Sequence, residues 1–174
     1  MKLIEDRVTD THVYFWGDPT LSNWGPAEFE YAGETFQNSE QAFMWEKAMC
    51  FKDYHIADKI LKNDNPSVAK KLGRQVKGYD EVVWKKKRYD VMVDVCQAKF
   101  KHNEDQRETL LSTGDRILVE GSPYDKVWGV GIHWAEESIL DDANWNGLNL
   151  LGKALMEVRK KLKKRNPDLY KQNK

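Results

Sequence analysis

Two charged side chains suited to catalysis, Glu40 and Lys47, lie in a segment whose other residues are largely apolar. The segment begins at Asn38, a good helix N-cap, and Gln41 completes a capping-box pattern three residues later. A helix starting there carries Glu40 in its first turn and Lys47 on the same face, about 10 Å further along the axis. Buried charges are uncommon unless they are paired or functional. The pattern leaves open a catalytic role, a structural ion pair, and a lysine that extends to solvent.

A loop from Leu21 to Pro26 supplies candidates for ligand binding. It contains Asn23 and Trp24 side by side. A tryptophan next to an amide could hold a planar ring together with its polar edge. A tryptophan that merely plugs the loop is the more common case, so both interpretations stand at this point.

A second loop, from Ser122 to His133, is rich in glycine around a tryptophan. Its glycines allow the backbone to approach a ligand closely or to adopt positive φ. The spacing of a phosphate-binding loop is missing. A tight turn beside a core tryptophan explains the same composition. The candidate residues in this loop are Asp125, Trp128, Gly129 and Gly131.

The last predicted helix places Gly152, Met156 and Arg159 on one face. A glycine inside a helix costs about 1 kcal/mol relative to alanine, and its benefit would be close approach by another helix or a ligand. Arg159 could then hold a phosphate or a carboxylate, and Arg74 and Arg88 are further phosphate candidates. The four histidines show no ligand spacing, so no metal site is predicted.

The elements that must position these residues are mostly helices. Strands are predicted over residues 11–16 and 116–120, with a β-hairpin turning at Ala32-Gly33. The longest helix, over residues 81–100, carries a predicted core stripe of Trp84, Val91, Val95 and Ala98. The other helices are predicted from Asn38, over residues 53–61, 67–72 and 103–111, as a helical turn over 136–142, and after Asn149 as N-cap.

The composition indicates a water-soluble globular protein in a reducing compartment, which we expect to be the cytoplasm. The 174 residues balance 28 Lys and Arg against 28 Asp and Glu, so no global field steers the chain toward nucleic acid or membrane. The sequence shows no targeting segment and no window able to span a bilayer. Its two cysteines, Cys50 and Cys96, are expected to be buried thiols.

Six groups of residues, in this order, resemble the YbiA-like, or NADAR, family of N-glycosidases over roughly residues 12–163. The chain differs at Leu148 and Leu150, where family members vary, and in a lysine-rich extension after Leu162. The six groups are LSNW at 21–24, T-x-x-x-S-E-Q at 35–41 running on to Lys47-Ala48, Trp84, Ala98-Lys99-Phe100, Asp125 with W-G-x-G at 128–131, and G-x-N-x-L-G at 147–152 followed by L-M-x-x-R at 155–159.

The resemblance implies a mainly α (α+β) fold with a small N-terminal β-hairpin or sheet. It implies one domain over residues 1–174, with its core at about 12–163 and a basic tail at 164–174. It also implies cleavage of N-glycosidic bonds, in ADP-ribose attached to guanine or in ribosylaminopyrimidine phosphates of riboflavin synthesis. The implied partner is such a small-molecule N-riboside or ADP-ribosylated guanine, including guanine in nucleic acid, with no cofactor, membrane or obligate protein partner.

The family's catalytic positions carry over to Glu40, Trp84 and Asp125. Lys47 joins them because it matches the family's lysine and also stands out in the residue pattern. The substrate-binding set comprises Asn23, Trp24, Trp128, Gly129, Gly131, Asn149 and Arg159.

Cleavage of a ribosylamine suits these residue types. The sugar becomes positively charged while the departing nitrogen takes a proton, and two carboxylates in different environments can divide that work. We expect Glu40 to be ionised, and Asp125 to act as partner acid or as anchor for a ribose hydroxyl. Lys47 offers a second route, because a desolvated amine can trap C1 of a ring-opened ribose as a Schiff base. The sequence does not choose between the two routes.

Two other classes of protein fit the same residues. A non-catalytic module that binds ADP-ribose or a nucleotide would use the aromatic and arginine side chains without needing Glu40, Lys47 and Asp125 together. A nucleic-acid-binding protein would use the basic C-terminal tail, although neutral net charge argues against non-specific binding.

Overall fold

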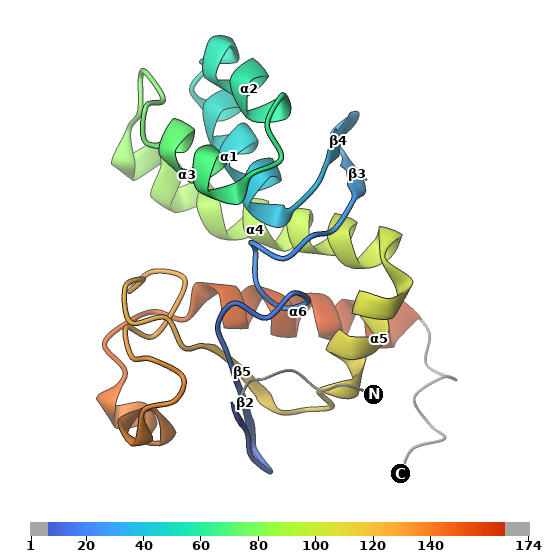
Figure 1. Cartoon of the computed structure of the whole chain (residues 1–174), viewed down its shortest axis with the longest axis vertical. Helices are drawn as coiled ribbons and strands as arrows, with labels where there is room; N and C mark the ends of the chain where they lie inside the picture. The colour runs from blue at the N-terminus through green and yellow to red at the C-terminus, as the bar shows by residue number, and fades with distance from the viewer. Residues whose placement is uncertain (1–6, 166–174) are drawn as a thin grey trace. The chain divides into compact units, whose positions relative to one another are not determined.

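The computed structural model describes residues 7–165, which form two compact units (Figure 1). One unit spans Asn23–Glu104, and the other combines the chain up to Ser22 with the chain from Asp105 onward. The predicted fold class, mainly α with a small β portion, is confirmed. One domain over residues 1–174 stays a prediction. Of the predicted basic tail, only Lys164 and Arg165 belong to the described residues, and they end the last helix.

The unit Asn23–Glu104 begins with the predicted β-hairpin. Its strands, β3 (Phe29–Tyr31) and β4 (Glu34–Phe36), pair antiparallel with Glu30 opposite Thr35. The two turn residues have positive φ, 51° at Ala32 and 85° at Gly33, as the right-handed twist of a two-residue hairpin requires. The hairpin delivers the chain directly to the helix that carries Glu40.

Four helices complete this unit: α1 (Ser39–Cys50), α2 (Tyr54–Leu61), α3 (Pro66–Gly73) and α4 (Glu81–His102). Helix α1 packs against each of the other three (Figure 1). This central place explains why α1 is apolar almost all the way round.

The core stripe predicted for α4 is confirmed at two of its four residues. Trp84 and Val95 are buried, but Val91 and Ala98 are only half-buried. The buried positions of α4 also include Met92, Val93, Cys96, Lys99 and Phe100. The helix therefore buries a wider face than one stripe, which single-helix periodicity does not reveal.

The second unit holds a three-stranded sheet with the order β1-β2-β5. Strand β2 (His12–Phe15) pairs antiparallel with β1 (Arg7–Val8) and parallel with β5 (Ile117–Glu120). Helix α6 (Leu150–Arg165) packs against β5, and α5 (Glu104–Ser112) leads into the strand. Two short 3-10 helices, η1 (Glu137–Leu140) and η2 (Asp142–Asn144), lie in the connection from β5 to α6.

The core of this unit joins the sheet to the connection between β5 and α6. Buried side chains from β2, β5 and the connection form one cluster, against which two partly buried tryptophans pack. Among residues 7–165, no helix has both the length and the apolar character needed to cross a membrane. The buried cluster is Tyr14, Val119, Val130, Ile132 and Ile139, with Trp134 and Trp145 beside it.

Candidate active site

Glu40 lies in the first turn of α1 and is only 7% exposed. Its backbone N–H donates to the carbonyl of Asn23 at 3.0 Å, so the Leu21–Pro26 loop is tied to the start of the helix. The unsatisfied N–H groups and the dipole at a helix N-terminus favour a negative charge there. The helix N-terminus thus favours a negative charge on Glu40, whereas burial opposes it, and an ionised Glu40 stays a prediction.

The predicted cap of α1 is confirmed and extends further than a capping box. Asn38 Oδ1 accepts from the backbone N–H of Gln41 at 2.8 Å. Gln41 Oε1 accepts from the N–H of Gln37 at 2.8 Å, one residue before the position that a standard capping box uses. The two side-chain amides then donate to carbonyls at the end of α2 and beyond it, including those of Ile60 and Asp64, at 3.0 and 2.7 Å. Glu40 therefore sits in a turn that is fixed from both sides.

Lys47 is half-buried near the other end of α1. Its Nζ lies 4.4 Å from the ring centroid of Tyr79. Burial lowers the pKa of Lys47, and the nearby charge of Arg74 lowers it further, whereas Glu81 and Glu40 act in the opposite direction. Within residues 7–165 Lys47 forms no ion pair with a carboxylate, so the structural ion pair considered from the sequence is not formed.

Trp84 belongs to an aromatic cluster in the same unit. It is 5% exposed, and its ring centroid lies 5.2 Å from Phe43 and 6.4 Å from Phe51. Phe51 in turn contacts Tyr79 at 5.4 Å, and Tyr79 lies under the ammonium of Lys47. A chain of ring contacts therefore links Trp84 to Lys47, while its burial gives it a core role as well.

Replacing Trp84 by phenylalanine tests the two roles separately. Because Phe keeps most of the ring area, we expect Trp84→Phe to lower the free energy of unfolding by about 1–2 kcal/mol. We also expect a lower single-turnover rate. The matched control is Phe43→Leu in the same cluster, which should lose similar stability and keep the rate. If both variants keep the rate, Trp84 is a core residue only and leaves the predicted catalytic set.

A groove of about 570 Å³ lies in this unit beside the 45%-exposed Trp24. The side chain of Asn23, by contrast, is buried and donates to Met92 Sδ at 3.4 Å. Lys70 Nζ lies 6.0 Å from the Trp24 ring. The groove is lined by Trp24, Pro26, Ala27, Glu28, Gln37, Asn38, Asp64, Asn65, Pro66 and Asn103. An exposed indole bordering amides and carboxylates suits a planar polar ring without negative charge.

Asp125 shapes the glycine-rich loop of the second unit. Its Oδ1 accepts from the backbone N–H groups of Val127 and Trp128, at 2.9 and 2.7 Å. Ser122 Oγ accepts from the Asp125 N–H at 3.2 Å and anchors the loop from the other side. Within residues 7–165 no donor bonds to Asp125 Oδ2, which leaves one oxygen of this half-buried carboxylate for a ligand.

The two glycines of the loop are needed for packing. A Cβ on Gly129 would meet the carbonyl oxygens of Asp125 and Glu120, both at 2.9 Å. Gly131 has φ +73°, and a side chain there would collide with Asn146. Both roles match the tight turn that the sequence left open, and direct contact of either glycine with substrate stays a prediction.

Asn149 directly precedes α6, as predicted, and its carbonyl accepts from the N–H of Lys153 at 3.1 Å, but its side chain does not cap the helix. Asn149 has φ 52°, and its side chain turns to the free edge of β5, where Oδ1 accepts from the N–H of Glu120 at 3.0 Å. Its Nδ2 donates to the carbonyl of Leu118 at 2.9 Å. The amide thus imitates one residue of a neighbouring strand. A substrate contact of Asn149 stays a prediction beside this structural function.

Asn149→Ala should lower the free energy of unfolding by about 2–4 kcal/mol. The change leaves a partly buried N–H and a buried carbonyl of β5 without their Asn149 partners and puts alanine in the left-handed region. Urea melts measure the effect. Asn149→Gly loses the same two hydrogen bonds without the backbone strain, so its difference from Asn149→Ala isolates the strain. Asn144→Ala, at an exposed asparagine in η2, is the control that should change little. A loss below about 0.5 kcal/mol for Asn149→Ala would contradict this account.

Arg159 is buried on α6 and bonded to its own unit. One guanidinium nitrogen donates to Thr113 Oγ1 at 2.7 Å and the other to the carbonyl of Arg116 at 2.8 Å. Burial lowers the pKa of Arg159, and the nearby charge of Asp115 raises it. Arg159 therefore fixes the segment before β5 to α6, a long-range contact that residue types and spacing do not reveal.

The predicted site residues form two groups, one in each compact unit. Asn23, Trp24, Glu40, Lys47 and Trp84 belong to the unit Asn23–Glu104. Asp125, Trp128, Gly129, Gly131 and Asn149 belong to one connected loop system in the other unit, where Trp128 is half-buried and its carbonyl accepts from the N–H of Leu151. Arg159 lies further along α6 in that unit.

Two candidate functional residues, Tyr79 and Ser122, are not predicted from the sequence. Tyr79 faces Lys47, and burial together with a hydrogen bond to Glu81 raises the pKa of its hydroxyl to about 12. Ser122 holds the Asp125 loop in place. Neither contact leaves a periodic signal in the sequence. Among the residues that the structure describes, no group of three or more His, Cys, Asp or Glu side chains could hold a metal ion.

The chain is similar to three known proteins over most of its length. The worm protein irg-1 from Caenorhabditis elegans is 38% identical over 91% of this chain and 82% of its own. N-glycosidase R617 from Acanthamoeba polyphaga mimivirus is 36% identical over 87% and 96%. The NMR structure of the E. coli protein YbiA matches with a TM-score of 0.75 and 27% identity, over 95% of this chain and 93% of that one.

These similarities confirm the predicted fold class and enzyme class, a hydrolase acting on N-glycosyl bonds. The family model described as "NADAR domain" matches residues 14–163, which is most of the 174-residue chain. The matched range nearly coincides with residues 12–163, over which the sequence resembles the family. This chain belongs to the NADAR domain family.

Proposed function

We propose that this chain hydrolyses the C1–N bond of a ribosylamine-type substrate, either ADP-ribose on guanine or a ribosylaminopyrimidine phosphate. The observation that carries the proposal is the buried carboxylate of Glu40 in the fixed first turn of α1. On the same helix Lys47 has a lowered pKa and forms no ion pair with a carboxylate among residues 7–165. The name of the relative R617, an N-glycosidase, supports the same reaction.

The first route uses the two carboxylates. When C1–N breaks, its electron pair goes to the departing nitrogen, which takes up a proton, and the sugar carries positive charge at C1 and the ring oxygen. Ionised Glu40 stabilises this cation or takes the proton of the water that attacks C1. Asp125 serves as the partner acid or binds a ribose hydroxyl through Oδ2, the oxygen that its own loop leaves free.

The second route uses the amine of Lys47. The substrate ring opens to an imine at C1, the neutral Lys47 amine adds to C1, and the base nitrogen leaves as a free amine. Water then hydrolyses the lysine imine and restores the amine. Burial supports this route because it raises the fraction of neutral Lys47 at a given pH.

The groove beside Trp24 is the proposed place for the base. Its exposed indole offers a stacking face, and its amides offer hydrogen bonds to a ring edge. Glu28 and Asp64 in its wall repel phosphates, so the groove fits the uncharged ring of the substrate rather than its phosphate end.

Two substrates test the proposal. The protein is incubated with DNA carrying ADP-ribosylated guanine and, separately, with a ribosylaminopyrimidine phosphate, and the released base or freed guanine is measured by mass spectrometry. Release from one of them, absent with Glu40→Gln, is the expected result. Tight binding of ADP-ribose with no release from either substrate would instead favour the non-catalytic binding module.

A further inference from the structure

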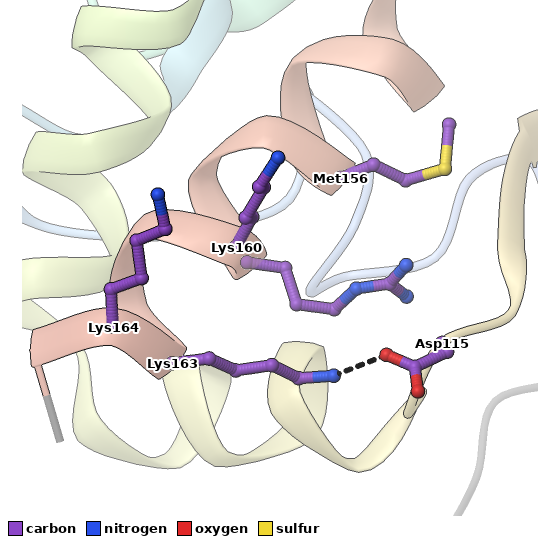
Figure 2. Close-up of a pocket in the computed structure, with 6 residues that line it drawn as sticks. Asp115, Met156, Lys160, Lys163 and Lys164 are labelled. Atoms are coloured by element: carbon purple, nitrogen blue, oxygen red, sulfur yellow. Dashed lines mark hydrogen bonds and ion pairs between the residues drawn. The ribbon is translucent and has the colours of Figure 1, made fainter. Parts of the chain in front are cut away.

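A basic pocket of about 580 Å³ lies along the C-terminal half of α6 (Figure 2). It is a local departure from a chain whose charges balance, 28 against 28. Its six lining residues carry four positive charges and one negative charge. They are Asp115, Met156, Arg159, Lys160, Lys163 and Lys164.

Two of the four cations are already bonded within the protein. The guanidinium of Arg159 donates to Thr113 and to the Arg116 carbonyl. Lys163 Nζ donates to the Gly114 carbonyl at 2.7 Å and to Asp115 Oδ1 at 2.8 Å. These bonds fix the wall of the pocket, and they also occupy its only carboxylate.

The other two cations of the pocket are Lys160 and Lys164. Figure 2 shows both extending to the same side of α6, whereas Lys163 reaches toward Asp115. Both are exposed and one turn apart, and within residues 7–165 neither has a hydrogen-bond or ion-pair partner. Like charges at this spacing repel each other. Their neighbour Lys161, by contrast, pairs with Glu157 at 2.9 Å.

The helix dipole accounts for only part of this arrangement. Cations near a helix C-terminus are favoured, which covers Lys163 and Lys164 in the last turn. Lys160 precedes the last turn and gains little from the dipole. The remaining positive charge therefore suits an external anion that bridges the two free ammonium groups.

We propose that this pocket binds the phosphates of a nucleic-acid strand. Two lysines one turn apart, about 6 Å along the helix axis, present flexible point charges on an open face, as backbone contacts require. A guanidinium would give one pyrophosphate bidentate bonds, but both terminal nitrogens of Arg159 already donate to protein oxygens. The proposal deepens the proposed function and rests on it, because the bound strand would be the one that carries the modified base.

Binding is tested without turnover, so its failure is distinct from failure of the proposed hydrolysis. The probe is a fluorescein-labelled, unmodified single-stranded oligodeoxynucleotide of about 16 nucleotides, followed by anisotropy at several salt concentrations. The pocket variant is Lys160→Glu/Lys164→Glu. The charge-matched control, Lys59→Glu/Lys153→Glu, changes two exposed lysines outside the pocket. Circular dichroism melts check that both variants are folded.

The pocket variant should bind the oligonucleotide at least about tenfold more weakly than the wild type, and the slope of log K against log salt should fall by about 1–2. The control should lose less than about twofold. Equal losses in both variants, or no binding by the wild type at low salt, would overturn the proposal. Displacement of the oligonucleotide by an equal concentration of ADP-ribose would also overturn it and make the pocket a nucleotide site.

Discussion

Glu40→Gln should lower the single-turnover rate by about 10² to 10³ while the protein keeps its fold, because removing one preorganised charge typically costs that much. The substitution preserves the shape of the side chain and its capacity for hydrogen bonding. The backbone bond from Glu40 to the Asn23 carbonyl does not depend on the side chain and should persist. Rates are measured on whichever substrate releases its base, beside thermal melts.

The control for Glu40 lies on the same helix. Glu46 is half-buried in α1 and accepts a hydrogen bond from the Tyr31 hydroxyl, so Glu46→Gln removes one carboxylate charge from α1 without touching the first turn. That variant should keep the rate within about threefold, since Glu46 lies about two turns from Glu40 and outside the predicted site. A Glu40→Gln protein that turns over normally but melts earlier would reduce Glu40 to a structural carboxylate.

The features of the fold that the sequence predicts correctly are those set by contacts between near neighbours in the chain. Asn38 and Gln41 mark the start of α1 because both groups act within one turn, and the structure confirms that cap. Ala32-Gly33 marks the hairpin because its left-handed backbone is needed on the spot. Such features depend on neighbours in the chain, so residue types and spacing are sufficient to find them.

The site is harder to predict where partners lie far apart in the sequence. Asn149 looks like a helix cap, yet its amide completes β5, about thirty residues earlier in the chain. Arg159 looks like a free phosphate ligand, yet it bonds to Thr113 and Arg116. Lys99 lies in the last turn of α4, where a lysine is expected to reach solvent, yet it is only 1% exposed. For Asn149 and Arg159, a tertiary contact overrides what the local pattern suggests.

Substitution of Lys47 separates a structural role from a functional role more clearly than substitution of the other site residues. Burial lowers its pKa, so the folded state penalises its protonated form, and this penalty is present at neutral pH and fades as pH rises past the lowered pKa. Lys47→Met removes the penalty and keeps the apolar stem. We therefore expect Lys47→Met to melt no earlier than the wild type at pH 7, yet to lose about 10²-fold or more in rate.

The imine route adds two readouts that a hydrogen-bond donor would not give. Borohydride added during turnover should reduce the C1 imine to a secondary amine, and peptide mapping should then locate a ribosyl adduct on Lys47. The rate should rise with pH and level off at the lowered pKa of Lys47, because only the neutral amine attacks C1. Lys47→Arg, which stays charged, should lose both the adduct and this rise. Absence of any adduct, with Lys47→Arg still impaired, would leave Lys47 as a donor to ribose, and full activity of both Lys47→Arg and Lys47→Met would remove it from the mechanism.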